Sequence, residues 1–425
     1  MSVYGPKGNQ VASDDDSRGM DSFARVTIAE DGIHTVRVHD LLKRGGDTFA
    51  YRIEITPIVP KLSFFLTDYE SASLVVPQGN RILFRLSTRR SDFDGLINFS
   101  FLDLPEGVTA EYGTFAQGRT EIPVLITATP EAMVSGALTS IAGIYEKEGL
   151  KVEGIYDQKV PLVFGRNKIV HLAQPVNKLA LAVTDKAPFH IEFTVPKSPI
   201  IQRSTKRIKI VATRDEGFTA PIKVHVPYFP TGFGGGTLTI PEGKTEAYLQ
   251  LEARPDAPLG EMKLAAIGES GGYQVATFFT PIPVDEPWIR YEMEELRLEQ
   301  GKNVEVKVKV IQVKPYEGSY ELEMRRLPKG VTTTKIPIDH TMTEVTFPLT
   351  VAVDAAAGKH GVVGFAVMLK QHDEDVLQMF PGNKITVFKP LPPELQKKPE
   401  PKPDPKVAKT EKPKPKRRTR FPETQ

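Results

Sequence analysis

Hydrophobic and polar residues alternate with a period of two along much of the chain. In residues 304–313 the sequence VEVKVKVIQV places valines at 304, 306, 308 and 310 between polar neighbours. Shorter runs of this kind occupy residues 34–38, 49–55 and 207–213. Because successive side chains of a strand point to opposite faces, the pattern predicts strands with one buried and one solvated face. Turn sequences such as Pro-Glu-Gly interrupt these runs at short intervals, which favours an all-β fold built of sandwiches.

Three segments of the chain repeat one pattern. In each, an aromatic residue precedes a Pro-x-Gly turn by 12 residues: Phe93 and Pro105, Phe218 and Pro230, Tyr316 and Pro328. An apolar strand pattern follows in each copy and leads to a short segment that ends at Ala132, Ala257 or Ala355. The glycine two residues after each proline is expected to adopt a positive φ. Spacings of 125 and 98 residues between the prolines fit complete immunoglobulin-like sandwiches, not a short solenoid repeat.

The repeat also decides how one ambiguous stretch folds. Residues 291–300, YEMEELRLEQ, are good helix formers by intrinsic propensity. Their position in the repeat, however, aligns residues 296–301 with residues 74–79 of the first copy. We therefore predict a strand over residues 295–299.

The N-terminal region predicts strands but no complete sandwich. Three strands are expected, at Phe23–Ile28, His34–Val38 and Phe49–Thr56, with turns at Asp31-Gly32 and Gly45-Gly46. Three strands make half a sandwich, so some strand edges lack partners. Because an unpaired edge is a template for another chain, we expect self-association through residues 21–57.

Composition narrows the class of protein. The chain has no cysteine, which excludes disulfides, cysteine-type zinc sites, iron–sulfur clusters and thiol catalysis. The 55 Lys and Arg nearly balance the 53 Asp and Glu, so we expect no nucleic-acid partner. The start of the chain does not read as a signal peptide, and the sequence has no apolar run long enough to predict a membrane span.

The charge is unevenly distributed, because residues 390–425 carry 10 prolines and 11 Lys and Arg against 5 Asp and Glu. Such a segment is predicted to be a disordered, extended tether. Its basic run, Lys412–Arg418, has the composition of a nuclear-localisation signal. It is interpreted either as a solvated tether or as a site of attachment to anionic cell-surface polymers.

Several groups of residues have the composition of a chemical site. The acidic cluster Asp14, Asp15, Asp16 and Asp21 could offer oxygens to calcium, but its spacing is not that of an EF-hand, and a solvated loop is favoured. We predict no catalytic, cofactor-binding or metal-binding residue and no cofactor. Three other groups of residues lack the spacing that a catalytic or binding site requires. These groups are His34 with His39, Gly234-Gly235-Gly236-Thr237, and Glu294-Glu295. The sole tryptophan, Trp288, is predicted to pack at the junction of two modules and not to stack on a sugar.

Parts of the sequence resemble a known family. Asp21-Ser22, Asp31-Gly32, Thr35–Val38 and Tyr51–Ile53 are similar to the C-terminal half of the bacterial pre-peptidase C-terminal domain. Arg44-Gly45-Gly46 and the turn Leu104–Val108 look like segments of large secreted proteins of planctomycete-type bacteria, in which immunoglobulin-like modules follow such a domain. The resemblance covers residues 14–165 best and implies export. The N-terminal half of that domain and a secretion signal have no counterpart here, so we expect an N-terminally truncated member.

These observations predict a modular all-β protein with a non-catalytic role. The expected parts are a disordered or loop segment (1–20), a half-sandwich (21–57), three immunoglobulin-like sandwiches (58–166, 167–285, 286–389) and the tail (390–425). The expected function is a binding or spacer region of an exported bacterial envelope or secreted protein, located outside the cell or in the periplasm. Two alternatives stay open, the accessory region of a secreted protease and carbohydrate-binding modules. The expected partner is a protein or polysaccharide at the cell surface.

Overall fold

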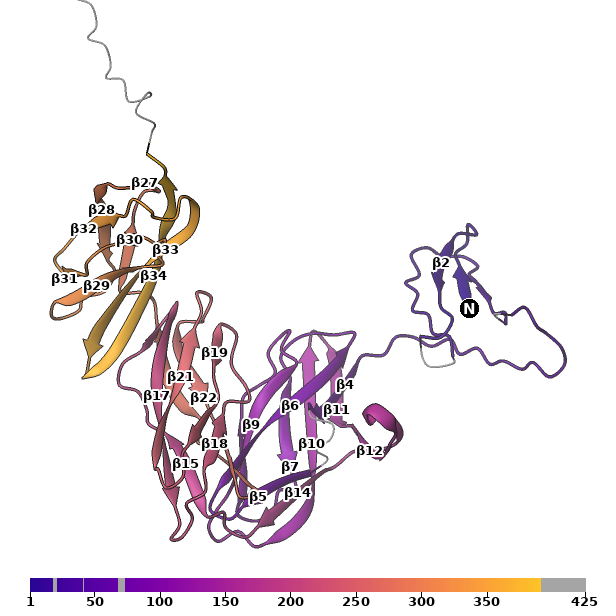
Figure 1. The fold of residues 1–425 in the computed structure, drawn as a ribbon. Coiled ribbons are helices and arrows are strands. Elements are labelled where there is room, and N and C mark those ends of the chain that lie inside the picture. Colours follow the sequence, from indigo (N-terminus) through magenta and orange to yellow (C-terminus); the bar gives the residue numbers. More distant parts are fainter. Residues whose placement is uncertain (18–20, 41, 68–72, 391–425) are drawn as a thin grey trace, which may run out of the picture. The chain divides into compact units, whose positions relative to one another are not determined.

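The computed structural model describes residues 1–17, 21–40, 42–67 and 73–390 (Figure 1). Over these residues the chain consists of β-strands and loops, with a single short 3-10 helix, η1 (Arg166–Lys168). The chain divides into two compact units, Met1–Val59 and Pro60–Gln425. The predicted all-β fold is therefore confirmed. The predicted tail lies outside the described residues from position 391 onward.

The N-terminal unit contains one small antiparallel sheet in the order β2-β1-β3. Its strands are β1 (Ser2–Tyr4), β2 (Gln10–Ser13) and β3 (Thr35–Arg37). The prediction of a loop over residues 1–20 is wrong in part, because Ser2–Tyr4 forms the central strand. Its Val3 is buried and pairs with Ala12 on one side and Val36 on the other.

Two of the three strands predicted in this unit are absent from its described residues. Only the central one forms, as β3, whereas residues 23–28 and 49–56 have no strand pairing. Alternating side chains give a segment one apolar face. A strand forms, however, only when its backbone N–H and C=O groups also pair with another strand. Within the described part of this unit, β1 provides such a partner for residues 35–37.

The first sandwich contains nine strands that are connected by hydrogen bonds. Eight of them follow the order β5-β14-β10-β11-β4-β6-β9-β8, and the ninth, β7, pairs with β10. One buried cluster, from Leu62 to Val183, draws side chains from both ends of this sheet. The strands are β4 (Lys61–Leu66), β5 (Ser73–Pro77), β6 (Arg81–Ser91), β7 (Asn98–Leu102), β8 (Val108–Tyr112), β9 (Glu121–Ala128), β10 (Ser135–Lys147), β11 (Leu150–Tyr156) and β14 (Leu179–Thr184).

Between β11 and β14 the chain forms a separate hairpin of β12 (Gln158–Phe164) and β13 (Val170–Val176). The predicted division between the first two sandwiches, at residues 166 and 167, falls in the turn of this hairpin. Strand β14 lies beyond it, yet β14 pairs with β5 and β10 of the first sandwich. We therefore propose that the first sandwich extends to Thr184.

The second sandwich surrounds a buried cluster that runs from Ala187 to Val284. Its sheets have the orders β15-β17-β21-β19, β16-β25-β22 and β20-β18-β23-β24. The strands are β15 (Phe189–Phe193), β16 (Ile200–Ile201), β17 (Ser204–Arg214), β18 (Ile222–His225), β19 (Phe233–Gly235), β20 (Leu238–Ile240), β21 (Glu246–Ala253), β22 (Gly260–Leu264), β23 (Ile267–Ser270), β24 (Tyr273–Ala276) and β25 (Thr280–Asp285).

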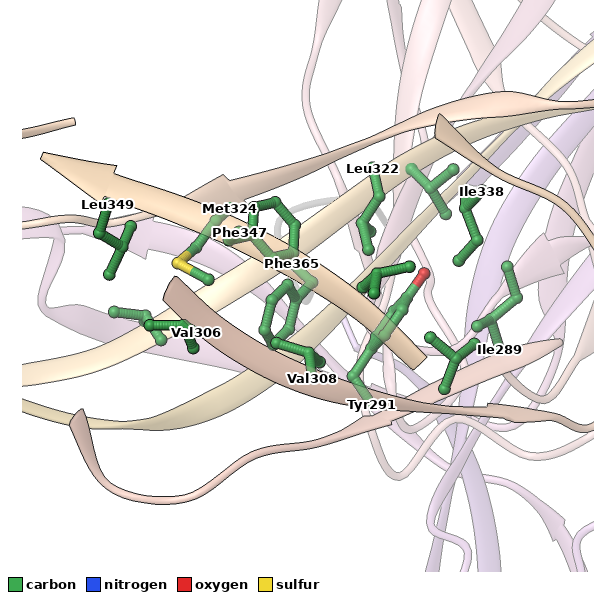
Figure 2. Close-up of a cluster of buried hydrophobic side chains, with 14 of the residues drawn as sticks. Ile289, Tyr291, Val306, Val308, Leu322, Met324, Ile338, Phe347, Leu349 and Phe365 are labelled. Atoms are coloured by element: carbon green, nitrogen blue, oxygen red, sulfur yellow. The ribbon is translucent and has the colours of Figure 1, made fainter. Parts of the chain in front are cut away.

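The third sandwich packs the sheet β26-β28-β32-β30 against the sheet β27-β34-β33-β29-β31. Figure 2 shows its core, where Tyr291 and Phe347 lie beside Phe365, with ring centroids 5.0 Å and 6.0 Å from that ring. The strands are β26 (Ile289–Glu292), β27 (Leu296–Glu299), β28 (Asn303–Gln312), β29 (Tyr320–Arg325), β30 (Val331–Thr332), β31 (Ile336–Ile338), β32 (Glu344–Val351), β33 (Gly358–Gln371) and β34 (Glu374–Phe388).

Two predictions from the sequence pattern are confirmed in this sandwich. Val306, Val308 and Val310 of β28 are buried, while the charged residues between them are exposed. The ambiguous segment folds as strand β27, which pairs in parallel with β34 between Leu296 and Ile385. Its pairing with the last strand outweighs the weak helical propensity of its residues.

The three sandwiches share the same construction around the Pro-x-Gly turn. The predicted positive φ is confirmed at Gly107, Gly232 and Gly330, with values of 77°, 84° and 85°. A Cβ at any of the three would lie 2.4 to 3.2 Å from the Cα of the alanine that ends the later repeat segment. In each sandwich an early strand also pairs in parallel with the last one, as β5 with β14, β16 with β25 and β27 with β34. The repeat therefore describes one sandwich design used three times.

Candidate functional site: the junctions between the sandwiches

The acidic residues near the N-terminus do not converge on a common point. Asp14 accepts hydrogen bonds from the backbone N–H groups of Phe23 (2.6 Å) and Ser17 (3.2 Å). The bond from Phe23 is the main reason that the pKa of Asp14 lies below its ordinary value. Among the described residues no group of three His, Asp or Glu side chains is arranged to hold a metal ion. The carboxylate of Asp14 acts within its own loop.

The histidines and the glycine run are placed by the fold at separate positions. His34 Nδ1 lies 3.2 Å from the carbonyl oxygen of Gly32, and His39 is exposed. The glycine run ends β19 and leads directly into β20, so no helix follows it. A Cβ at Gly235 would lie 2.8 Å from the Phe229 ring, which explains a glycine there by packing.

The remaining sequence candidates separate into surface and junction residues. Glu294 and Glu295 are exposed in the loop between β26 and β27. Trp288, in contrast, is only 4% exposed and belongs to the third core together with Ile201 of the second sandwich. It therefore packs at the junction of two modules, as predicted. The basic run Lys412–Arg418 lies outside the described residues.

A hydrogen-bonded network surrounds Trp288. Its Nε1 donates to the carboxylate of Asp285 (2.9 Å), the last residue of β25 in the second sandwich. Lys314 of the third sandwich donates to the same carboxylate, and the backbone N–H of Trp288 donates to the side chain of Gln378 (2.8 Å). Burial alone would raise the pKa of Asp285, but the bonds from Lys314 and Trp288 outweigh it and lower the pKa. One carboxylate thus joins the end of one sandwich to the next.

A second charged cluster connects the same two sandwiches. Lys206 of β17 lies 3.0 Å from Glu374, the first residue of β34, and its ammonium is buried. Glu374 also accepts hydrogen bonds from the hydroxyl of Ser198 (2.7 Å) and from the backbone N–H groups of Lys197 and Ser198 (2.9 Å each). Burial raises the pKa of Glu374, but these donors outweigh it and bring the pKa to about 2.

The junction between the first and second sandwiches is apolar at its centre. Leu83 of β6 and Leu125 of β9 form a buried cluster with Ala265, Ile267 and Ala276 of the second sandwich. This cluster is separate from the three sandwich cores. Burying such side chains removes apolar surface from water, which holds the two modules together.

Arg81 lies beside this apolar cluster and is 9% exposed. Its guanidinium carbon is 3.1 Å from the centroid of the Phe278 ring, and it donates to the carbonyl oxygen of Ala276 (3.4 Å). Burial lowers its pKa, although the charge of Glu192 acts in the opposite direction. Asn80 next to it donates to the carbonyl oxygen of Phe189 in the second sandwich (3.0 Å). The junction therefore combines apolar packing, a cation–π contact and hydrogen bonds.

Sequence reasoning identified Trp288 but missed the other junction residues. One signal was present, because Val124, Leu125 and Ile126 are three consecutive apolar residues in a strand. All three are buried, so β9 is covered on both faces. No comparable signal marks Lys206, Glu374 or Arg81, whose partners lie more than 160 residues away.

Known proteins match this chain in structure but not in sequence. The sequence matches no protein-family profile and no curated protein. Among solved structures, the D0-D1 domain of intimin is 12% identical and covers 47% of this chain and 97% of its own, with a TM-score of 0.17. The fibronectin(III)-like modules of CbhA from Clostridium thermocellum are 12% identical, cover 54% and 95%, and give a TM-score of 0.16. The adhesin InvE from Yersinia pseudotuberculosis is 8% identical, covers 53% and 58%, and gives 0.18.

The sheets and cores of the chain itself define its fold. In the described residues there is no helix with the length and apolar character needed to cross a membrane.

Proposed function

We propose that the three sandwiches act as a stiff, non-catalytic spacer and binding region of an exported bacterial envelope or secreted protein. The observation that carries this proposal is the pair of junctions. Each buries residues from two sandwiches, and only residues 185–188 and 286–288 connect the neighbouring strands. Short connections and packed junctions restrict rotation between modules, which is what a spacer requires.

Export and a bacterial origin come from the resemblance of residues 14–165 to pre-peptidase C-terminal and associated modules, and they remain our proposal. So do the expected cell-surface protein or polysaccharide partner and the two alternative roles, protease accessory and carbohydrate-binding modules.

Nitrogen-15 relaxation of backbone amides tests the spacer role directly. If the sandwiches move as one body, amides of all three report one rotational correlation time. The double variant Lys206→Ala/Glu374→Ala, which removes one junction contact, is expected to let the third sandwich tumble faster than the first two. The variant Lys335→Ala/Glu321→Ala removes a Lys–Glu pair within the third sandwich and should change nothing. Three different correlation times in the unmodified chain would overturn the proposal.

A further inference from the structure

The hairpin of β12 and β13 exposes apolar side chains on both sides of its turn. Leu162 and Leu172, one from each strand, are 58% and 54% exposed. The exposed set around the turn comprises Leu162, Val163, Phe164, Ile169, Val170 and Leu172. A contiguous group of this kind is unusual on a soluble surface and marks a contact site.

The hairpin is anchored at its base and uncovered at its closed end. The side chain of Gln158 is buried and accepts a hydrogen bond from the backbone N–H of Leu66 (2.9 Å) in the first sandwich. Among the described strands, β12 and β13 pair only with each other. An isolated two-stranded hairpin is marginally stable in water. The apolar end therefore gains from being covered by a surface other than the unit to which the hairpin belongs.

The charges of the hairpin indicate what covers it. Residues 158–176 contain Lys159, Arg166 and Lys168 and no Asp or Glu. The charged side chains of this segment are therefore all positive, which makes it locally cationic. Cations beside apolar residues complement a surface that is anionic outside and apolar beneath.

The backbone of the hairpin argues against a further strand as its partner. Pro161 lies in β12 and Pro175 in β13, and neither can donate a backbone hydrogen bond. The strand edges are therefore poor templates for another chain. The contact surface is the closed end, with its side chains, and not an edge.

We propose that the closed end of this hairpin inserts into the interface of a bilayer that contains anionic lipids. Residues 162–164 span roughly 10 Å at the rise of an extended strand, comparable to the depth of about 5–10 Å that interfacial segments reach. Apolar residues on both strands suit lipid, which surrounds an inserted tip from all sides. The insertion would place the stiff sandwiches against a membrane surface, a role beyond that of a spacer.

A fluorescent label on the hairpin tests the proposal in the full chain. Because the protein has no cysteine, Val163→Cys can be labelled selectively with the polarity-sensitive dye NBD. Phosphatidylglycerol vesicles are expected to raise its emission and shift it to the blue, and phosphatidylcholine vesicles to do so far less. The same dye at Glu131→Cys, an exposed position away from the hairpin, should not respond.

Three outcomes would overturn the proposal. Co-sedimentation with phosphatidylglycerol vesicles without a change at position 163 would assign binding to another cationic segment, such as residues 390–425. A blue shift that grows with protein concentration in the absence of vesicles would assign the hairpin to a second copy of the chain. Failure to sediment with anionic vesicles would exclude a membrane contact.

A second variant measures the apolar contribution. Leu162→Ser/Leu172→Ser removes two exposed side chains and is expected to leave thermal unfolding unchanged. It should weaken binding to phosphatidylglycerol vesicles by roughly tenfold or more, since each leucine contributes through its buried apolar area. Unchanged binding by a folded variant would contradict insertion.

Discussion

The side-chain amide of Gln300 donates a 2.6 Å hydrogen bond to the carbonyl oxygen of Ala355, 55 residues later in the chain. The same bond joins Gln202 to Ala257 (2.7 Å) in the second sandwich and Gln78 to Ala132 (2.6 Å) in the first. In all three the backbone N–H of the glutamine also donates to the last strand of its sandwich. In each sandwich, one glutamine after an early strand thus binds both the last strand and the turn whose alanine contacts the Pro-x-Gly glycine.

Replacing this glutamine should destabilise the third sandwich. We expect Gln300→Ala to lower the free energy of unfolding by about 1 kcal/mol, because it leaves the carbonyl oxygen of Ala355 without that donor. Urea unfolding followed by Trp288 fluorescence measures the change. Gln274→Ala, which removes an exposed amide that contacts Glu269, is the matched control and should have almost no effect. Equal effects of the two substitutions would contradict the structural role of Gln300.

The glycine of the Pro-x-Gly turn should be intolerant of any side chain. Gly330 has a φ of 85°, and a Cβ there would lie 2.7 Å from the Cα of Ala355. Gly330→Ala is therefore expected to cost at least about 2 kcal/mol from backbone strain and overlap together. Gly361→Ala, at a glycine of β33 with open space around it, serves as control. The prediction is wrong if thermal denaturation gives the two variants the same stability.

Acid should weaken the junction between the second and third sandwiches. The pKa of Glu374 is about 2 in the folded chain, against an ordinary value of 4.5. A carboxyl group with a lowered pKa contributes its full stabilisation above its unfolded pKa. That contribution is lost as the pH falls from about 4.5 to about 2. Because Glu374 is partly exposed, the loss is expected to be on the order of 2 kcal/mol.

The variant Glu374→Gln isolates this contribution. It cannot titrate, so its stability should fall less between pH 5 and pH 2.5 than that of the unmodified chain. Glu323→Gln, at an exposed glutamate that pairs with Arg325, should keep the original pH dependence. Parallel pH profiles for all three proteins, measured by chemical denaturation, would show that Glu374 does not stabilise the junction.

The N-terminal unit should promote self-association. In the described chain residues 49–56 form no strand, yet Tyr51 and Ile55 are 74% and 81% exposed. We expect the chain to form concentration-dependent oligomers that Tyr51→Ser/Ile55→Ser reduces, since less apolar surface would be buried between copies. Light scattering coupled to size-exclusion chromatography measures the mass. A monomer at all concentrations for the unmodified chain would contradict the prediction.

Sequence pattern predicted the parts of this fold that depend on local order. Alternation located β28, and the repeat corrected the helical propensity of the segment that becomes β27. The Pro-x-Gly turns implied a positive φ because few other residues adopt it. The same reasoning failed for residues 23–28 and 49–56, because alternation does not reveal whether a partner strand exists.

Most residues of the junctions carry no signal in the sequence that marks them as contacts. Trp288 was suggested by its size and its place between modules, and β9 by its unbroken apolar run. Lys206 and Glu374, however, look like ordinary surface charges in the sequence. They meet only because β17 and β34 contact each other in the folded chain. Contacts between modules depend on tertiary geometry that no local pattern encodes.

Distance measurements between spin labels test the central claim, that the sandwiches form one stiff body. Glu131, Asp256 and Asp354 occupy equivalent exposed positions in the three copies of the repeat, and the absence of native cysteine allows labelling at each pair. Double electron–electron resonance on the pairs 131–256, 256–354 and 131–354 is expected to give one narrow distance distribution for each. Broad distributions for the pairs that span a junction would contradict the account.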